Sequence, residues 1–464
     1  MAASLSALLG TMQDALAAQQ AGLDVTGQNI TNVNTPGYVK RSAVLESRAV
    51  LPGSDGGVDV AEIQRAFDSF TYSQVLTEHG QKSAADARSS SLGEAQAIVA
   101  PQGGGSVSDA MNAFFSSLQA LTANPGDPSV RSAVLANATQ LSQSFSTTAN
   151  GLAQEQSALY SQAQGTASAL NQDLTQIAKL NAQIAQAQGT GDSAPDLRDK
   201  RDSLVSTVAD AIGARVVPDP SGTVTLFAAG TVLVSGDKAA TLGVSLDTAG
   251  AMKFTVANPG GAPLDVTAGV TDGTLGGLRE ARDVDIAQTA TQLDQLAYNF
   301  ANNVNSVHST GYGLDGATGR PLFAPPASVA GAAASMAVDP SVAGQPGNIA
   351  AAANALDVPG GNDIAVQLAQ IASQPLGAGG PPAQQFASIA SQLGSAKSAA
   401  DTDAATRADM VTQAENLNSS ASGVSLNEEM VNLTRFQQAF QAATRVLQVT
   451  DSLLGDFMTA MSTA

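Results

Sequence analysis

Residues 1–38 read MAASLSALLGTMQDALAAQQAGLDVTGQNITNVNTPGY, and they contain a helical pattern with one apolar stripe. The stripe residues recur at alternating steps of four and three, and this period of 3.5 is typical of a coiled-coil seam. Gln19 and Thr26 occupy two of the seam positions. Because an isolated helix is marginal in water, we expect this one to order only against partner helices. The apolar seam residues are Leu5, Leu9, Met12, Leu16, Leu23 and Ile30.

A second stripe lies at the other end of the chain, where apolar residues recur every seven positions. Ser425 and Glu428 precede it with the spacing of a capping box. Two arrangements fit the two stripes: an antiparallel helix pair that closes a single monomeric domain, or packing against neighbouring subunits. Periodicity alone leaves both open. The members of the second stripe are Leu433, Phe440, Leu447, Leu454 and Met461.

The N-terminal stripe ends in the segment from Asn29 to Tyr38, where Pro36 and Gly37 suit the central positions of a type II turn. Beyond this turn the sequence predicts an irregular stretch to about Gly57, followed by a helical pattern that continues through Val99.

Four further segments carry helical periodicity. Asp127 and Pro128 suit an N-cap and a first helical position, and the apolar repeat that follows predicts one long helix to about Gly189. Pro195 opens a helix that ends near Ile212, and the pattern returns from Leu275 to His308 and from Phe386 to about Gly423.

The helix at 195–212 carries two pairs of opposite charges at i,i+4 spacing, Asp196 with Lys200 and Arg198 with Asp202. Such pairs contribute only tenths of a kcal/mol. We interpret them as a solvated face, with a contact between subunits as the alternative.

Between Val216 and Thr267 the period changes from 3.6 to 2, and six short apolar runs separated by Gly, Pro and Asp predict a small β domain. The stretch 312–382 is rich in Gly, Ala and Pro, with short helices expected at 349–356 and 364–372. The prediction is a mainly α protein with terminal coiled-coil helices, a core bundle of long helices and an inserted β domain. Its nested domains are 1–45 with 424–464 (terminal assembly), 46–213 with 274–423 (helical core) and 214–273 (β insert).

Composition and charge restrict the function. The 464 residues include no Cys and carry a net charge of −19, which argues against binding to nucleic acid or to anionic membranes. No segment has the pattern of a cleavable secretory signal or of a membrane span, so export would need a dedicated machine.

Catalytic and metal-binding patterns are lacking in the sequence. His79 and His308 lie in different segments without a nearby set of ligands, and the glycine clusters at 103–105 and 377–380 lack the Lys-Ser/Thr of a phosphate loop. We therefore expect no catalytic residues, no cofactor and no metal, and we do not expect an enzyme.

Both ends of the chain resemble one family. Residues 28–38, QNITNVNTPGY, are similar to the N-terminal signature of the axial proteins of the bacterial flagellum, which are its rod, hook and hook-associated proteins. Residues 423–433, GVSLNEEMVNL, and 436–442, FQQAFQA, resemble the matching C-terminal signature. The signature turn residues are Asn29, Asn32, Asn34, Thr35, Pro36, Gly37 and Tyr38.

Internal segments resemble the hook-associated branch of that family, at the junction between hook and filament. The run 196–204, DLRDKRDSL, distinguishes this branch, because hook and rod proteins lack the helix that carries it. Further similar segments are 57–65, 114–121, 124–128, 276–279 and 292–297.

The resemblance implies a structural protein that is exported through the flagellar channel and self-assembles into a tube, linking the hook to the filament outside the cell. It implies as partners other copies of the chain, the hook protein, a second junction protein or filament subunits, and an export chaperone at the C-terminal helix. The alternatives are another axial protein (a hook, rod or second junction protein) or an enzyme secreted by the flagellar route.

Overall fold

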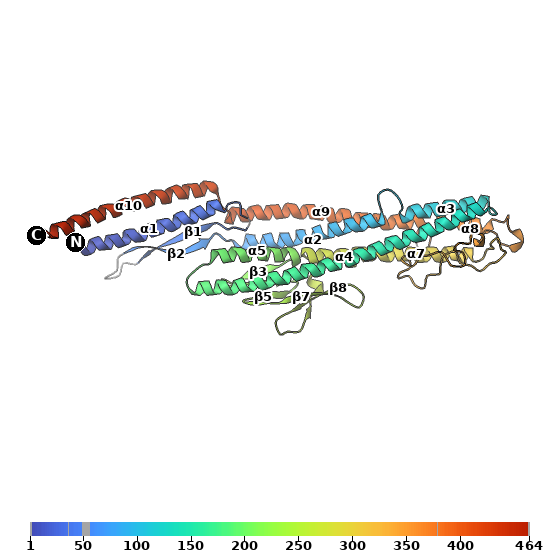
Figure 1. Cartoon of the computed structure of the whole chain (residues 1–464), viewed down its shortest axis with the longest axis horizontal. Helices are drawn as coiled ribbons and strands as arrows, with labels where there is room; N and C mark the ends of the chain where they lie inside the picture. Colours follow the sequence, from blue (N-terminus) through green and yellow to red (C-terminus); the bar gives the residue numbers. More distant parts are fainter. Residues whose placement is uncertain (1, 36, 49–55, 378, 463–464) are drawn as a thin grey trace.

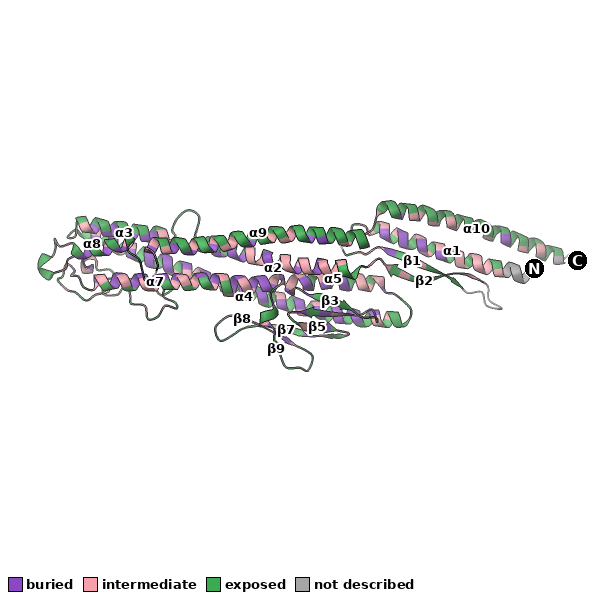
Figure 2. Ribbon diagram, turned by 180° about the vertical axis from the view of Figure 1, so that it is seen from behind, coloured by how far each residue is buried: buried purple, intermediate pink, exposed green. Residues whose placement is uncertain are grey.

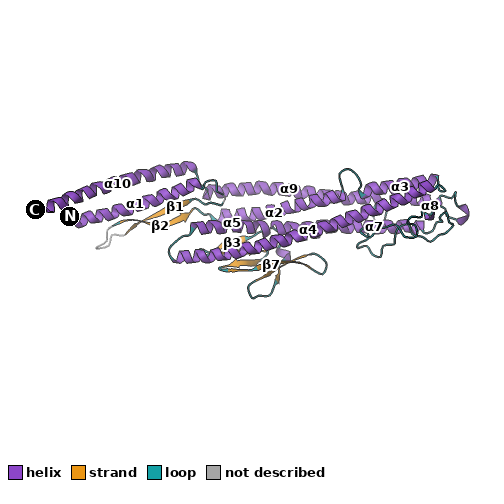
Figure 3. Ribbon diagram, in the orientation of Figure 1, coloured by secondary structure: helices purple, strands orange, loops and turns teal. Residues whose placement is uncertain are grey.

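The computed structural model describes residues 2–35, 37–48, 56–377 and 379–462. The molecule is a long rod, and both chain ends lie at the same tip (Figure 1). A pair of terminal helices forms that tip, a bundle of long helices continues the rod, and small sheets lie along one side of the bundle (Figure 3). The predicted mainly α fold with an inserted small β unit is confirmed.

The terminal helices are α1, Ala2–Thr31, and α10, Leu426–Ser462, and they pack along each other. Gly22 of α1 lies against the ring of Phe436 on α10, since an added Cβ would be 2.5 Å from a ring carbon. Much of the surface of α10 is exposed, whereas α1 lies between α10 and a β-hairpin (Figure 2). The two terminal helices therefore have different surroundings.

The hairpin consists of β1, Arg41–Arg48, and β2, Gly57–Arg65, paired antiparallel. The predicted irregular stretch and the helical pattern directly after Gly57 are wrong at these residues. The register shifts between Val44 and Leu45, so a bulge interrupts the alternation that would have indicated a strand. The helix begins later, at Ser69, where the Asp68 carboxylate accepts a hydrogen bond from the Thr71 N–H.

The core bundle is built from long helices whose ends follow local signals. As predicted, α4 begins at Pro128 with the Asp127 side chain as its N-cap, and it runs for 62 residues to Gly189. The helix α5, Pro195–Ile212, ends as predicted at Gly213, whose φ of +72° suits glycine. The other core helices are α2 Ser69–Val99, α3 Val107–Ala123, α6 Gly273–Glu280, α7 Ala287–His308, α8 Asp363–Gln370 and α9 Pro382–Ser422.

Aromatic side chains fill the core at the end of the bundle far from the chain termini. Phe300 of α7 lies at its centre, with ring centroids 6.0 Å from Phe114 and Phe115 of α3 and 5.7 Å from Phe323. Phe145 of α4 completes the group at 6.4 Å. These contacts join three helices and the irregular segment after α7 in one hydrophobic core.

The β insert contains two antiparallel sheets, ordered β3-β4-β5-β6 and β7-β8-β9. Asn171 and Asn181 of α4 hold the insert to the bundle, because each side chain both donates to and accepts from a strand backbone, at Leu242 and Val224 respectively. All six predicted apolar runs fall on strands. The strands are β3 Arg215–Pro218, β4 Val224–Ala228, β5 Thr231–Ser235, β6 Lys238–Ala239, β7 Thr241–Leu246, β8 Met252–Ala257 and β9 Leu264–Asp265.

The insert leaves and re-enters the bundle at one place. A Cβ added to Gly213 would collide with the side chain of Asp272, and one added to Gly273 would collide with the backbone of Ala211 and Ile212. Both glycines have positive φ values, +72° and +70°. The end of α5 and the start of α6 are therefore in direct backbone contact.

The irregular segment after α7 contains one of the two short helices expected there. The expected helix at 364–372 is present as α8 and the 3₁₀ turn that follows it, but the one at 349–356 is wrong. The alanine run 350–353 has helical propensity, yet its backbone bonds elsewhere: the N–H of Tyr312 donates to Ala352, and the N–H of Ala351 donates to Tyr312. Tertiary pairing outweighs propensity here.

Candidate assembly surface and joint

The N-terminal seam residues whose side chains are described, Leu9, Met12, Leu16, Leu23 and Ile30, are half-buried on α1. Of the most buried positions, Thr26 belongs to the predicted seam, and the others lie beside it, at Ala18, Gly22, Val25 and Asn29. The reason is that α1 contacts α10 on one side and the hairpin on another, so its buried face is broader than a single seam. The side chain of Leu5 lies outside the described residues.

On α10, the predicted residues Leu433, Phe440, Leu447 and Leu454 are half-buried on one stripe, and Met461 lies outside the residues whose side chains are described. Glu429 and Thr450 are the most buried residues of this helix. The structure therefore brings the two predicted stripes into one helix pair within a single chain.

The helix α10 has a second apolar row, which the sequence reasoning did not predict. Val446, Val449 and Leu453 recur at steps of three and four, and each is exposed by 43–60%. We call these three residues the outer row. Exposed apolar residues that are contiguous on a helix mark a surface for association.

A joint between the terminal helix pair and the core surrounds Asn29, which is 1% exposed. Its Nδ2 donates to the Arg41 carbonyl (2.8 Å) and to Oε2 of Glu429 on α10 (3.0 Å). Its Oδ1 accepts from the Tyr38 hydroxyl (2.9 Å) and from the Arg41 N–H (3.1 Å). One amide thereby connects α1, the signature turn, the hairpin and α10.

The other signature residues shape the turn itself. Asn32 Nδ2 donates to the Gln28 carbonyl, and the Thr35 hydroxyl donates to Asn32 Oδ1 (3.1 Å). Gly37 has a φ of +78°, and the Tyr38 N–H donates to the Thr35 carbonyl, as in the predicted turn. Asn34 is exposed, and Pro36 lies outside the described residues.

Lys40 joins the hairpin to the C-terminal part of the chain. Its ammonium is 2.6 Å from Glu428 and 3.8 Å from Glu429, and its backbone N–H donates to the carbonyl of Ser422 at the end of α9. The pKa of Glu428 is lowered by its hydrogen bond to Lys40. Glu428 thus contacts the hairpin, not the Ser425 backbone that the predicted capping box required.

Asp199 and Asp202 on α5 face the hairpin, so the interpretation as a solvated face is wrong for the Arg198–Asp202 pair, whereas Asp196 and Lys200 are exposed. Arg41 and Arg65 are directly opposite in the β1–β2 register. The Asp199 carboxylate lies between them, with Oδ2 2.5 Å from Arg41 and Oδ1 2.7 Å from Arg65. Burial raises the pKa of Asp199, and the two arginines oppose that shift.

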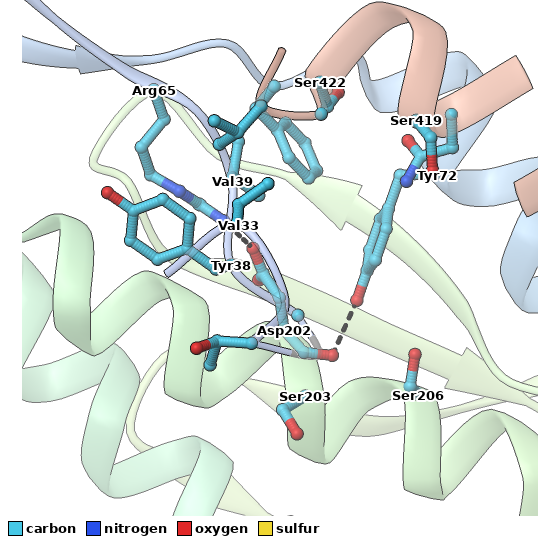
Figure 4. Close-up of a pocket in the computed structure, with 16 residues that line it drawn as sticks. Val33, Tyr38, Val39, Arg65, Tyr72, Asp202, Ser203, Ser206, Ser419 and Ser422 are labelled. Carbon is cyan, nitrogen blue, oxygen red and sulfur yellow. Dashed lines mark hydrogen bonds and ion pairs between the residues drawn. The ribbon is translucent and has the colours of Figure 1, made fainter. Parts of the chain in front are cut away.

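Asp202, one turn further along α5, completes this cluster. Its carboxylate is 2.8 Å from Arg65 and 3.0 Å from Arg201, and its backbone carbonyl accepts from the Tyr72 hydroxyl at 2.8 Å. Figure 4 shows Arg65 and Tyr72 reaching Asp202 from different sides. Burial raises the pKa of Tyr72 well above its ordinary value, so this hydroxyl stays a donor.

A cleft of about 290 Å³ lies beside these contacts, between the signature turn, α5 and the end of α9. Serine hydroxyls line much of it, and Ser422, which is buried, has an Oγ without a hydrogen-bond partner. The labelled serines are Ser203, Ser206, Ser419 and Ser422 (Figure 4).

Sequence reasoning missed the ionic part of the joint. A signal was present, because Asp196, Asp199 and Asp202 recur every three residues and so share one face of α5. A face with three carboxylates requires cations if it is covered. Arg41 and Arg65, which are opposite each other at the open end of the hairpin, supply them.

In the part of the chain that the structure describes, no cluster of three or more His, Cys, Asp and Glu side chains is arranged to hold a metal ion. Within the same residues, none of the helices has the apolar length needed to cross a membrane.

Three family models match different parts of the chain. The flagellar hook-associated protein FlgK helical domain matches residues 92–323, which is half of the 464 residues. The flagella basal body rod protein model matches residues 9–38, and the C-terminal model of the flagellar basal body rod FlgEFG proteins matches residues 417–460. The terminal models coincide with α1 and α10.

Individual relatives agree with these models. Flagellar hook-associated protein 1 of Salmonella typhimurium is 29% identical over 334 residues, covering 69% of this chain and 59% of that protein. The proteins of the same name from Escherichia coli and Bacillus subtilis are each 27% identical, and each alignment covers 97–98% of both chains.

A solved structure is also similar. The flagellar hook junction protein FlgK from Burkholderia pseudomallei is 27% identical, with a TM-score of 0.50 over 54% of this chain and 46% of that one. The chain thus spans less than two thirds of the length of two of these relatives. The matched helical domain, the two terminal models and these relatives lead to one conclusion: the chain belongs to the FlgK family of flagellar hook-associated proteins.

Proposed function

We propose that this chain is a structural subunit of the bacterial flagellum that self-assembles into a tube and joins the hook to the filament. The observation that carries the proposal is the outer row on α10. Its three apolar side chains face away from the helix pair, although the predicted stripes already pair within the chain. A monomer gains nothing from exposing them, whereas a neighbouring copy can cover them.

The joint supports a mechanical role. The terminal helix pair is held to the rod by buried ion pairs at Arg41 and Arg65 and by the Asn29 hydrogen bonds. In an assembled tube, this arrangement would transmit the position of the inner helices to the core. We propose the terminal helices with the hairpin as the assembly unit, since the predicted boundary at residue 45 falls inside β1.

Further partners follow from the same proposal. They are the hook protein on one side, a second junction protein or filament subunits on the other, and an export chaperone at α10. The seam residues of both stripes would hold the pair together, and the outer row would contact the next copy. Export through the flagellar channel would place the protein outside the cell.

The double variant Val449→Asp/Leu453→Asp, made in the purified full-length chain, tests whether the outer row is the contact between copies. Both side chains are exposed, so we expect the free energy of unfolding to change by less than about 0.5 kcal/mol per site. Polymerisation, measured by sedimentation and electron microscopy, should be lost. Gln448→Asp adds a charge to an exposed residue outside the outer row and should leave polymerisation intact. Equal loss in both variants would contradict the outer row as the contact.

The place of the protein in the flagellum is tested by deleting its gene. We expect intact hooks without filaments, and flagellin shed into the medium as monomer. Absence of the hook would instead assign the chain to the hook or rod. Normal filaments would overturn the proposal.

A further inference from the structure

His79 lies on α2 where α2, α5 and α9 meet. Its Nδ1 is 3.2 Å from Oδ1 of Asp210 on α5, and its Nε2 is 3.1 Å from Oε1 of Glu415 on α9. Beside it, Gly80 brings the α2 backbone against Gly213, since an added Cβ would be 2.9 Å from the Gly213 Cα. The imidazole therefore bridges two helices at a point where α2 and α5 are already in backbone contact.

The protonation state of the ring decides how many of these contacts hold. A neutral imidazole has one N–H, so it can donate to only one of the two carboxylates, and its other nitrogen presents a lone pair to the second. Imidazolium donates at both nitrogens and pairs with both negative charges. The hydrogen bond to Asp210 raises the pKa of His79 above its ordinary value, and Glu415 adds to this against the opposing effect of burial.

The two carboxylates differ in how strongly they depend on His79. The Ser83 hydroxyl donates to Asp210 Oδ1 at 3.2 Å, and the Thr274 hydroxyl of α6 donates to the Asp210 backbone carbonyl. Asp210 thus has partners besides His79. Glu415 has a side chain that is 53% exposed, and its carboxylate contact to α2 runs through His79.

Charged residues on the other elements packed against α2 are engaged elsewhere. Glu78 of α2 is 3.9 Å from Arg407 of α9. Arg279 and Glu280 of α6 line a separate cleft with Arg407, and Arg215, the one charged residue of β3, is exposed. The helix α4 contacts α2 at its far end, where Gly151 lies against Ile98.

We propose that His79, through its protonation state, controls how firmly α9 is held to α2. In its charged form it ties both α5 and α9 to α2. When the ring loses its proton, the contact to Asp210 is kept and the contact to Glu415 is lost. The end of α9 is then less firmly held, two turns before Ser422, whose carbonyl accepts the Lys40 N–H at the joint. This inference does not depend on the proposed function.

The test is an NMR titration of the imidazoles in the full-length chain between pH 5 and 9. The chain has two histidines, and His308, whose pKa burial lowers to about 4, serves as an internal reference. We expect His79 to titrate above the value of about 6.5 found in unfolded chains. In Glu415→Gln its midpoint should move to lower pH, with no change at His308.

A second measurement follows the helix directly. Hydrogen-exchange protection factors of residues 415–422 should fall as the pH rises through the His79 midpoint, and they should be independent of pH in His79→Gln. A His79 midpoint at or below 6.5, or one unchanged in Glu415→Gln, would overturn the proposal. So would pH-dependent protection that persists in His79→Gln.

Discussion

Asn29 of α1 and Glu429 of α10 are 400 residues apart in the chain, and a buried hydrogen bond of 3.0 Å joins them. The same Asn29 amide holds the Tyr38 hydroxyl and the backbone of Arg41. All four hydrogen-bonding positions of a primary amide are used. The signature segment thus fixes α10 to the turn that follows α1.

Replacing Asn29 by Ala should therefore separate the terminal pair from the rod. Removing the amide takes one hydrogen bond from the buried Glu429 carboxylate and two from the Arg41 backbone, at about 1–3 kcal/mol for each buried group left unsatisfied. We expect amide exchange in α1 and α10 to accelerate while the core helices stay protected, as measured by hydrogen exchange with mass spectrometry. Thr31→Ala, which removes an exposed hydroxyl bonded within α1, is the control. Uniform destabilisation of the core would contradict this reading.

Asp199→Asn should destabilise the joint strongly. The substitution removes the charge between Arg41 and Arg65, whose side chains are only 5% and 8% exposed. Breaking a buried ion pair typically costs about 3–5 kcal/mol, because the remaining charges stay buried.

The matched control is Asp196→Asn on the same helix. Asp196 also contacts Arg41, at 2.7 Å, but its side chain is 78% exposed. Exposed pairs contribute about 0–1 kcal/mol, so we expect little change in chemical denaturation. Similar effects for the two variants would show that the cluster is not desolvated in solution.

His308 should make the folded chain less stable in mild acid. The ring is 1% exposed, with Nδ1 2.8 Å from the Arg320 carbonyl and Nε2 accepting from the Ala350 N–H. Burial lowers its pKa to about 4, whereas in the unfolded chain it is about 6.5. The unfolded state therefore binds the proton first. Stability is present above pH 6.5 and is lost as the pH falls towards 4.

Protonation of this one group should lower the free energy of unfolding by about 2 kcal/mol between pH 7 and pH 5. It is measured as the difference in the free energy of unfolding between the wild type and His308→Gln, since other groups titrate in both. The variant should be less stable at pH 7 and less dependent on pH. An equal pH dependence in the two chains would refute a neutral buried His308.

Ala194→Gly should be tolerated, because strain at this position offsets what glycine loses. Ala194 has a φ of +46° directly before α5, a conformation that costs an L-residue about 1–2 kcal/mol. Glycine removes that strain, but it loses more backbone entropy and the methyl group of a buried residue, so we expect the free energy of unfolding to change by less than about 0.5 kcal/mol in thermal or chemical denaturation. Ala153→Gly, at an exposed position inside α4, should instead destabilise by about 1 kcal/mol.

The limits of sequence reasoning are visible in particular elements. The starts of α4 and α5 were predictable because Pro128 and Pro195 act locally. The hairpin was not, because the bulge at Val44 disrupts its alternation. The ionic joint was missed for a different reason: Asp199 meets Arg41, 158 residues away, and helix periodicity contains no information about such a partner. The outer row on α10 could be recognised only after the structure showed which face of α10 packs against α1 and which stays exposed.

The backbone contact between Gly273 and the end of α5 has a consequence for engineering. Because the strands between these points form an excursion whose two ends are adjacent, a change in the length of its outer loops leaves the register of the helices on either side unchanged. Ile212 and Thr274 are therefore natural splice points. A foreign domain with adjacent termini that also covers the face of α4 beneath the strands could be carried there, displayed on the flank of the rod and away from the helices at its tip.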